Sequence, residues 1–246
     1  MKKTTKRTWM AFLVIALLLL LIGWYPFRMY QETQKMSPLA TQEIIKGIYV
    51  IKDSFVNCYI IKGNNGYIAV DAGNSRGQVK QEMQKLSIDH QKVLAVFLTH
   101  SDSDHVAALD LFTHAKIYFS KDEEQMINGE TPRFALFKNK KMARYELLHN
   151  GQIKYVSGLQ VKGIATPGHT PGSMCYLIND TYLFVGDTMS LKNGKADLFN
   201  EFFNMDSETQ RHSVKKLAAL KKLRYIFTGH YGFTDNPVTA FKDTGR

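Results

Sequence analysis

Cysteine is nearly absent from this chain of 246 residues, which contains two, Cys58 and Cys175. Two cysteines cannot form the framework of a small disulfide-stapled protein. Both lie in apolar, strand-like runs, where a buried free thiol is an ordinary core residue. We therefore expect two free thiols. No cysteine follows the apolar N-terminal stretch to accept a lipid, and no repeat with a period of roughly 20–50 residues is visible.

Acidic residues are absent from the first 28 positions, which carry five Lys and Arg residues. The formal charge of the chain is +10, so subtracting these five leaves +5 for residues 29–246. This remainder is mildly basic. It favours anionic substrates or a polyanionic cell envelope, but only weakly.

An uncharged and almost wholly apolar stretch runs from Trp9 to Phe27. A helix needs about 20 such residues to cross a bilayer. Four basic residues precede the stretch and one follows, which keeps the N-terminus in the cytoplasm. A cleavable signal peptide is the alternative, but bulky aromatic residues stand where small cleavage-site residues are usual. We therefore predict a cytoplasmic tail at 1–8, a single-pass transmembrane signal anchor at 9–27, a linker at 28–42 and an extracytoplasmic domain at 43–246.

Short apolar runs alternate with amphipathic segments through this domain, which predicts an α/β protein with a mixed sheet. The expected strands are 48–51, 56–61, 67–70, 93–98, 116–119, 152–155, 159–164, 175–178, 182–185 and 225–227. The expected helices are 75–86, 106–112 and 213–223.

Four potential metal ligands follow the expected strand 93–98 within six residues: His100, Asp102, Asp104 and His105. A tight turn cannot direct all four side chains at one ion. We therefore expect two adjacent ions, the first facing His100 and Asp102 and the second facing Asp104 and His105. A helix cap formed by Ser103 or Asp104 is the simpler alternative, but it explains neither histidine.

Three more apolar runs end in loops with candidate ligands. His169 lies in the proline-framed loop 166–173, Asp187 follows the strand 182–185, and His230 follows the strand 225–227. One such loop is common by chance, whereas four of them indicate a common site.

These four loops resemble those of the metallo-β-lactamase fold superfamily, over roughly residues 44–235. The usual family motif is His-x-His-x-Asp-His, followed by a lone His, a bridging Asp and a last His. The resemblance implies an αββα sandwich and two metal sites: a first with His100, Asp102 and His169, and a second with Asp104, His105 and His230, bridged by Asp187. Asp102 departs from the pattern, because the commonest form has His there.

The resemblance also implies a metal-dependent hydrolase with two divalent ions. Zinc is the first expectation, and the oxygen ligand Asp102 moves the preference somewhat toward iron or manganese. Two ions about 3.5–4 Å apart can share a water and lower its pKa to about 7, giving a hydroxide that attacks a carbonyl carbon or a phosphorus. Asp104 is the expected catalytic residue, ligating one ion and passing the proton.

The sequence leaves the substrate open. An ester, an amide or a phosphodiester is compatible with the site, and nucleic acid is included because DNA-uptake competence proteins of this fold also show the Asp. Diiron redox enzymes of the superfamily likewise put a carboxylate at the position of Asp102, but usually need a flavin domain. A non-catalytic envelope protein is a further alternative, which predicts degraded ligands, whereas all seven are present. The expected partners are a small or anionic substrate and, through the N-terminal helix, the membrane.

Two further features carry open alternatives. Residues 120–147 are polar and basic, with Lys138, Lys140, Lys141 and Arg144, and form either a surface insertion or a loop whose cations hold an anionic substrate over the site. Asp71, at the end of the strand 67–70, is either a plain turn residue or a residue that orients a ligand.

Overall fold

The computed structural model describes residues 2–134, 137–139 and 141–244, with the backbone alone for residues 2–7 and 16–22. The chain divides into two compact units, Met1–Met36 and Ser37–Arg246.

The N-terminal unit is the helix α1 (Lys2–Thr33), which continues through residues 28–33, where the sequence predicts a linker. Near its end, Glu32 pairs with Arg28 at 2.9 Å and with Lys35 at 2.6 Å. Within the described part of the chain, no helix combines the length and the apolar character that crossing a bilayer requires. The side chains of residues 16–22, at the centre of the predicted anchor 9–27, lie outside the described residues, so the anchor stays a prediction.

The first sheet of the C-terminal unit has seven strands in the order in which they occur along the chain. Its first four strands pair antiparallel, and the last three are added in parallel. The strands are β1 (Gln42–Ile45), β2 (Ile48–Asp53), β3 (Val56–Lys62), β4 (Tyr67–Val70), β5 (Val93–Phe97), β6 (Lys116–Ser120) and β7 (Tyr145–Leu148).

The second sheet has six strands in the order β15-β14-β11-β10-β9-β8, and a separate hairpin joins β12 (Met189–Lys192) to β13 (Lys195–Leu198). The strands of this sheet are β8 (Ile153–Val156), β9 (Leu159–Ala165), β10 (Met174–Ile178), β11 (Tyr182–Phe184), β14 (Tyr225–Phe227) and β15 (Phe233–Thr234). The hairpin and β15, like β1 and β7, are not among the strands predicted from the sequence.

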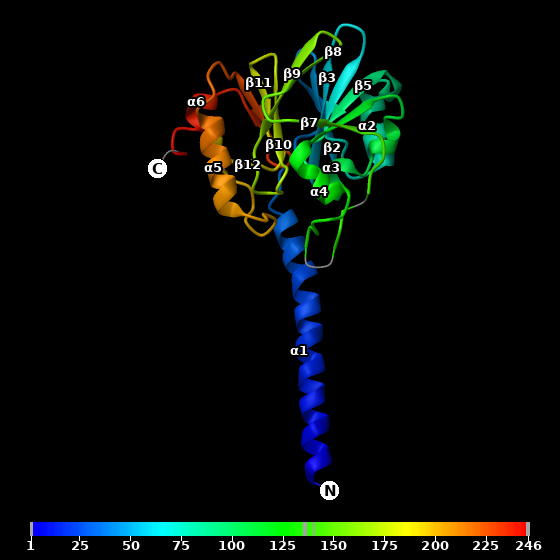
Figure 1. Ribbon diagram of the computed structural model, residues 1–246, viewed down its shortest axis with the longest axis vertical. Helices are drawn as coiled ribbons and strands as arrows, with labels where there is room; N and C mark the ends of the chain where they lie inside the picture. Colours follow the sequence, from blue (N-terminus) through cyan, green and yellow to red (C-terminus); the bar gives the residue numbers. More distant parts are fainter. Residues whose placement is uncertain (1, 135–136, 140, 245–246) are drawn as a thin grey trace. The chain divides into compact units, whose positions relative to one another are not determined.

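The two sheets pack face to face, and helices cover their outer faces (Figure 1). Alternate residues of a strand point to opposite faces, so Phe97 of β5 joins the core between the sheets while Val96 packs beneath α2 (Arg76–Lys85). On the other side, α5 (Ser207–Ala218) packs its buried residues Val214 and Leu217 against the second sheet. The predicted αββα sandwich is confirmed.

Several short helices complete the unit, namely α3 (Ser103–Val106), α4 (Glu124–Ile127) and α6 (Pro237–Ala240), with 3-10 turns at His90–Lys92, Leu109–Leu111 and Lys121–Glu123. The helix predicted at 106–112 is thus replaced by α3 and a 3-10 turn. The helix predicted at 213–223 begins earlier, at Ser207, because Asp206 caps it by accepting a hydrogen bond from the Thr209 amide at 2.9 Å.

The topology brings the loops that carry the candidate ligands to one edge of the sandwich. β9 and β11 are both antiparallel to β10, and β14 is parallel to β11, so these three strands end at the same edge of their sheet. In the facing sheet, β4 and β5 run parallel and also end together. The Met174 amide donates to the Thr99 carbonyl at 2.9 Å, which joins the end of β5 to the start of β10.

Candidate metal centre

The structure brings all seven predicted ligands into one cluster. Their ligand atoms form three overlapping groups in which every atom lies within 4.8 Å of the others. The groups are His100–Asp102–His169, His100–His105–Asp187 and Asp104–His105–His230. Two of these groups contain the residues that the resemblance assigns to the first and the second site, and the third joins one histidine of each site to Asp187; the division into two sites stays a prediction.

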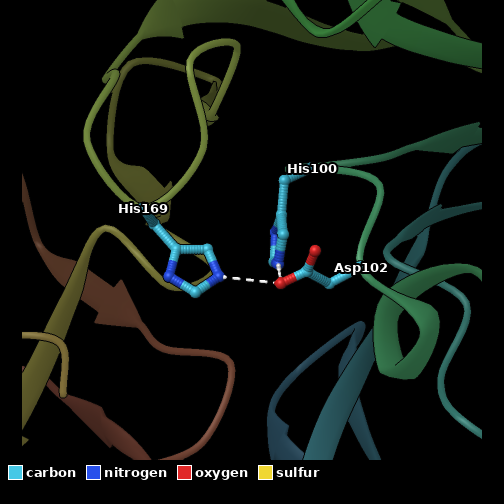
Figure 2. Close-up of side chains that lie close together, drawn as sticks. All are labelled: His100, Asp102 and His169. Atoms are coloured by element: carbon cyan, nitrogen blue, oxygen red, sulfur yellow. Dashed lines mark hydrogen bonds and ion pairs between the residues drawn. The ribbon is translucent and has the colours of Figure 1, made fainter. Parts of the chain in front are cut away.

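The first group lies between the loop after β5 and the loop after β9 (Figure 2). The Oδ2 atom of Asp102 is 3.1 Å from Nε2 of His169 and 3.6 Å from Nε2 of His100. A ligand to zinc lies about 2.0–2.2 Å from the ion, so ligand atoms at these separations can share one ion after small adjustments.

The second group is built around His230, which follows β14. Its Nε2 atom lies 3.4 Å from Oδ2 of Asp104, 3.2 Å from Oδ2 of Asp187 and 3.4 Å from Nε2 of His105. Asp187 also lies 3.5 Å from Nε2 of His169, so its carboxylate contacts both groups, as a bridging ligand requires.

A helix cap does not account for the motif. Ser103 and Asp104, the two expected cap residues, both lie inside α3; the N-cap position is occupied by Asp102, whose side chain makes no capping hydrogen bond. This carboxylate is instead directed into the cluster.

Each histidine is held through Nδ1, which leaves Nε2 directed at the centre of the cluster. Metal-binding histidines in proteins are almost always oriented in this way. The partners of Nδ1 are Thr99 Oγ1 for His100 (3.0 Å), Asp71 Oδ2 for His105 (2.9 Å), Asn204 Oδ1 for His169 (3.1 Å) and the Phe55 carbonyl for His230 (2.6 Å).

Asp71 thus has the orienting role that the sequence left open. Besides His105, it accepts hydrogen bonds from the amide of Thr99 at 2.8 Å and from the hydroxyl of Thr99 at 3.0 Å. Asn204 could not be predicted, because it comes from an irregular loop without a recognisable motif.

Two buried atoms of the cluster have no hydrogen-bond partner, Nε2 of His100 and Oδ1 of Asp187. Leaving a buried polar group unsatisfied costs about 1–3 kcal/mol, so such atoms need an explanation. Both are of the kind that ligate zinc, and both lie beside other ligands of the same kind. The donor set therefore fits divalent metal ions.

Burial and neighbouring charges shift the pKa values of the cluster in opposite directions. Burial alone would raise the pKa of Asp187, but His230 and His105 outweigh this and hold it well below its usual range. Burial would likewise lower the pKa of His105, yet Asp187, Asp71 and Asp104 raise it well above the ordinary value. The carboxylate of Asp187 is therefore favoured in its ionised form, which is the form that binds a cation.

One glycine is needed for the two sheets to meet at the site. Gly186 precedes Asp187 and has a positive φ of +51°. A Cβ atom there would lie 2.4 Å from Oγ1 of Thr99, which is too close for any side chain. Only glycine lets the loop after β11 approach the loop after β5.

Glu123 is a buried carboxylate that sequence reasoning missed. It accepts hydrogen bonds from the Ser101 amide (2.8 Å) and hydroxyl (2.6 Å), from the Thr170 hydroxyl (2.7 Å) and from the Gly172 amide (3.2 Å). Burial raises its pKa, and the hydrogen bonds from Ser101 and Thr170 partly offset this. Because Ser101 follows His100 and Thr170 follows His169, Glu123 fixes the two ligand loops of the first site relative to each other.

The segment 120–147 also supplies Arg133, which contacts the first site directly. Its Nε atom donates to both carboxylate oxygens of Asp102, at 2.7 and 2.9 Å. Burial alone would raise the pKa of Asp102, but Arg133, with His100 and His169, holds it well below its usual range. Among the four cations singled out in the sequence, Lys138, Lys141 and Arg144 are exposed, and Lys140 lies outside the described residues.

Both cysteines are free and buried, as predicted. Burial raises the pKa of Cys175 to about 11 and the pKa of Cys58 well above its ordinary value.

Comparison with known proteins identifies the class to which this fold and site belong. The family model of the metallo-beta-lactamase superfamily matches residues 51–230. The chain therefore belongs to this superfamily, and its clusters of His and Asp are of the kind that could hold metal ions.

Individual relatives are similar over part of the chain. The probable polyketide biosynthesis zinc-dependent hydrolase BaeB of Bacillus velezensis is 34% identical over 137 residues, which cover 54% of this chain and 54% of that protein. The atrochrysone carboxyl ACP thioesterase of Aspergillus fumigatus is 26% identical over 182 residues, covering 73% of this chain and 52% of that protein. The chain thus matches about half the length of these two relatives.

A solved structure supports the fold. A B3 metallo-β-lactamase with an active-site glutamic acid superimposes with a TM-score of 0.67 at 17% identity, covering 85% of this chain and 88% of that one. At this level of identity the likeness concerns the fold alone.

Proposed function

We propose that this hydrolase cleaves an acyl bond, a thioester or an ester, with two divalent metal ions held by His100, Asp102, Asp104, His105, His169, Asp187 and His230. The observation that carries the proposal is the convergence of four Nε2 atoms and three carboxylates, two of whose buried atoms have no other partner. Zinc is the proposed metal, because the similar hydrolase BaeB is described as zinc-dependent.

Two observations favour an acyl substrate over a phosphodiester. The names of two relatives refer to polyketide biosynthesis and to a thioesterase, both of which concern acyl chemistry. In addition, Phe199 lies edge-on to His169, with ring centroids 5.1 Å apart, and Phe55 stacks on His230 at 5.9 Å. Aromatic rings beside the ligands suit an apolar acyl group better than a charged phosphodiester.

When bound, divalent ions supply Lewis acidity and lower the pKa of a water molecule to about 7. The protein's own groups do the remaining work. The buried carboxylate of Asp187 holds Nε2 of His230 and of His169 at fixed separations. Asp104 is the more accessible acid, with 18% of its side chain exposed against 4% for Asp187. We therefore assign to Asp104 the transfer of the proton between the water and the leaving group.

The test uses the full chain, loaded separately with Zn²⁺, Mn²⁺ and Fe²⁺. It is assayed on a chromogenic thioester, an ester and a phosphodiester. Asp187→Ala serves as the inactive reference, because it removes the carboxylate that contacts both groups. Asp235→Ala is the matched control, since Asp235 is an exposed acid outside the cluster.

We expect turnover of the thioester or ester with zinc, unchanged in Asp235→Ala and abolished in Asp187→Ala or by a chelator. Asp104→Asn should lose turnover by about 10²–10⁴-fold, the usual contribution of a general acid or base. Full activity of Asp187→Ala would overturn the site. Turnover of the phosphodiester alone would retain the site and replace the substrate class.

The location of the chain outside the cytoplasm also stays a proposal, supported by the basic residues that precede the apolar stretch at 9–27. In intact cells, an external protease should then degrade the C-terminal unit and leave a cytoplasmic control protein whole. Complete protection of this unit would contradict the proposed location.

A further inference from the structure

Arg133 brings a permanent positive charge into a site whose other charged groups suit it to bind cations. Its side chain is buried, with 6% of the residue exposed. A guanidinium group offers five N–H donors and no acceptor.

The contacts of Arg133 use the same atoms that a first metal ion needs. Its Nε atom donates to Oδ1 of Asp102 at 2.7 Å and to Oδ2 at 2.9 Å. Its Nη2 atom donates to the Phe203 carbonyl at 2.6 Å and lies 3.2 Å from Nε2 of His169. Since Nδ1 of His169 is held by Asn204, the lone pair that faces Arg133 is the one left for a metal.

An arginine that merely oriented Asp102 would leave the Nε2 lone pair of His169 free. Arg133 instead engages both oxygens of Asp102 and also faces the lone pair of His169. The carboxylate oxygens have further lone pairs and can accept from Arg133 while they bind an ion, but Nε2 of His169 has only one. A zinc ion about 2.0–2.2 Å from this nitrogen cannot share its lone pair with an N–H donor, so the two cations compete for His169.

The second site has no such competitor. Within the described ranges 2–134, 137–139 and 141–244, no Lys or Arg side chain forms a hydrogen bond or ion pair with Asp104, His105 or His230. The two sites therefore differ in what must move before an ion enters.

We propose that Arg133 is a built-in competitor for the first metal ion, so that the chain fills the second site first and the first site only when Arg133 withdraws from His169. This inference rests on the two-ion site of the proposed function and adds an order of loading and the residue that sets it.

The test is a calorimetric titration of Zn²⁺ into the metal-free full chain, with metal content measured after dialysis. Wild type should show a tight event and a second event weaker by at least about tenfold, since charge-assisted hydrogen bonds must be given up. Asp102→Asn identifies the weaker event by removing a ligand of the first site. Arg133→Met should tighten that event by at least about tenfold and leave the tight event unchanged.

Arg144→Met is the matched control, because it removes the same charge from an exposed position of the same segment. It should reproduce the wild-type titration. Arg133→Lys covers the case in which the methionine variant does not fold. A lysine keeps the charge but cannot hold both oxygens and the histidine in one plane, so its first-site affinity should fall between wild type and Arg133→Met.

Two results would overturn the proposal: two events of equal affinity in wild type, or a weaker first site in both Arg133 variants, which would make Arg133 an orienting residue. Either result leaves the proposed hydrolase intact. Failure of wild type to bind zinc at all would instead remove the proposed function together with this inference.

Discussion

Replacing Glu123 by alanine should destabilise the domain and weaken its first metal site together. The carboxylate accepts four hydrogen bonds from two loops. The hydroxyl of Thr170 can turn to Ser173, 2.8 Å away, and the hydroxyl of Ser101 keeps the hydrogen bond that it accepts from the side-chain amide of Asn139 at 2.6 Å. The amides of Ser101 and Gly172 have no such freedom, because backbone donors cannot rotate.

Each buried amide left without a partner costs about 1–3 kcal/mol. Removing the desolvation cost of the carboxylate offsets part of this sum, so we expect a loss of about 3 kcal/mol in the free energy of unfolding. For a domain of this size, 1 kcal/mol lowers the melting temperature by about 2–4 °C. The metal-free variant should therefore melt roughly 6–12 °C below wild type.

Calorimetry of the metal-free chain measures this loss, and a zinc titration should show first-site affinity reduced by about 10–100-fold, the usual effect of losing a supporting partner. Glu124→Ala is the matched control, because the neighbouring Glu124 forms a surface pair with Lys121 and a long hydrogen bond with the Tyr145 hydroxyl at 3.5 Å, and should cost less than about 1 kcal/mol. A Glu123→Ala variant as stable as the control would refute the reasoning that Glu123 fixes the two loops.

Three more predictions follow from the site and the core. Asp71→Asn should weaken zinc binding at the second site by about 10–100-fold in a titration, because His105 loses the carboxylate that orients it; unchanged affinity would contradict that role. Zinc binding at neutral pH should release protons, seen as a dependence of the binding heat on the buffer, because carboxylates outweigh burial and hold the pKa of His105 and His230 above the ordinary value. Because both pKa values are raised in the folded state, protonation of these histidines stabilises the metal-free fold below the ordinary histidine pKa, and this stability is lost as the pH rises through the raised pKa. A melting temperature of the metal-free chain that did not change over this pH range would contradict the raised pKa values. Cys58 and Cys175 should react with a thiol reagent at pH 8 only after unfolding, because burial raises the pKa of both; fast labelling of the native protein would show that the strands are open.

The ligand set could be predicted from the sequence because each ligand directly follows an apolar run. His100 comes after β5 and His230 after β14, so local pattern and chain order are enough to place them at strand ends. The αββα arrangement followed from the resemblance, and the structure agrees with it. Hydrophobic periodicity is a local property of the sequence, so it is enough to place the strand ends and the ligands that follow them.

Other features depend on contacts between distant residues and could not be predicted in this way. Glu123 and Arg133 lie in a segment without periodicity, and their roles come from hydrogen bonds to loops that are distant in the sequence. The start of α5 was misplaced because the cap formed by Asp206, rather than the apolar stripe, sets its first turn.

The origin of the ligands in both sheets gives bound metal a mechanical consequence. His100 and His105 follow β5 of the first sheet, and His169 and His230 follow β9 and β14 of the second, so ions between them would cross-link the two halves of the sandwich. A ligand that binds only the folded state stabilises it by about 2.7 kcal/mol at a concentration of 100 times its dissociation constant. Removing the ions with a chelator would thus remove this cross-link. The two sheets should then separate first at the edge where the ligands meet, and proteolysis after chelation should begin there.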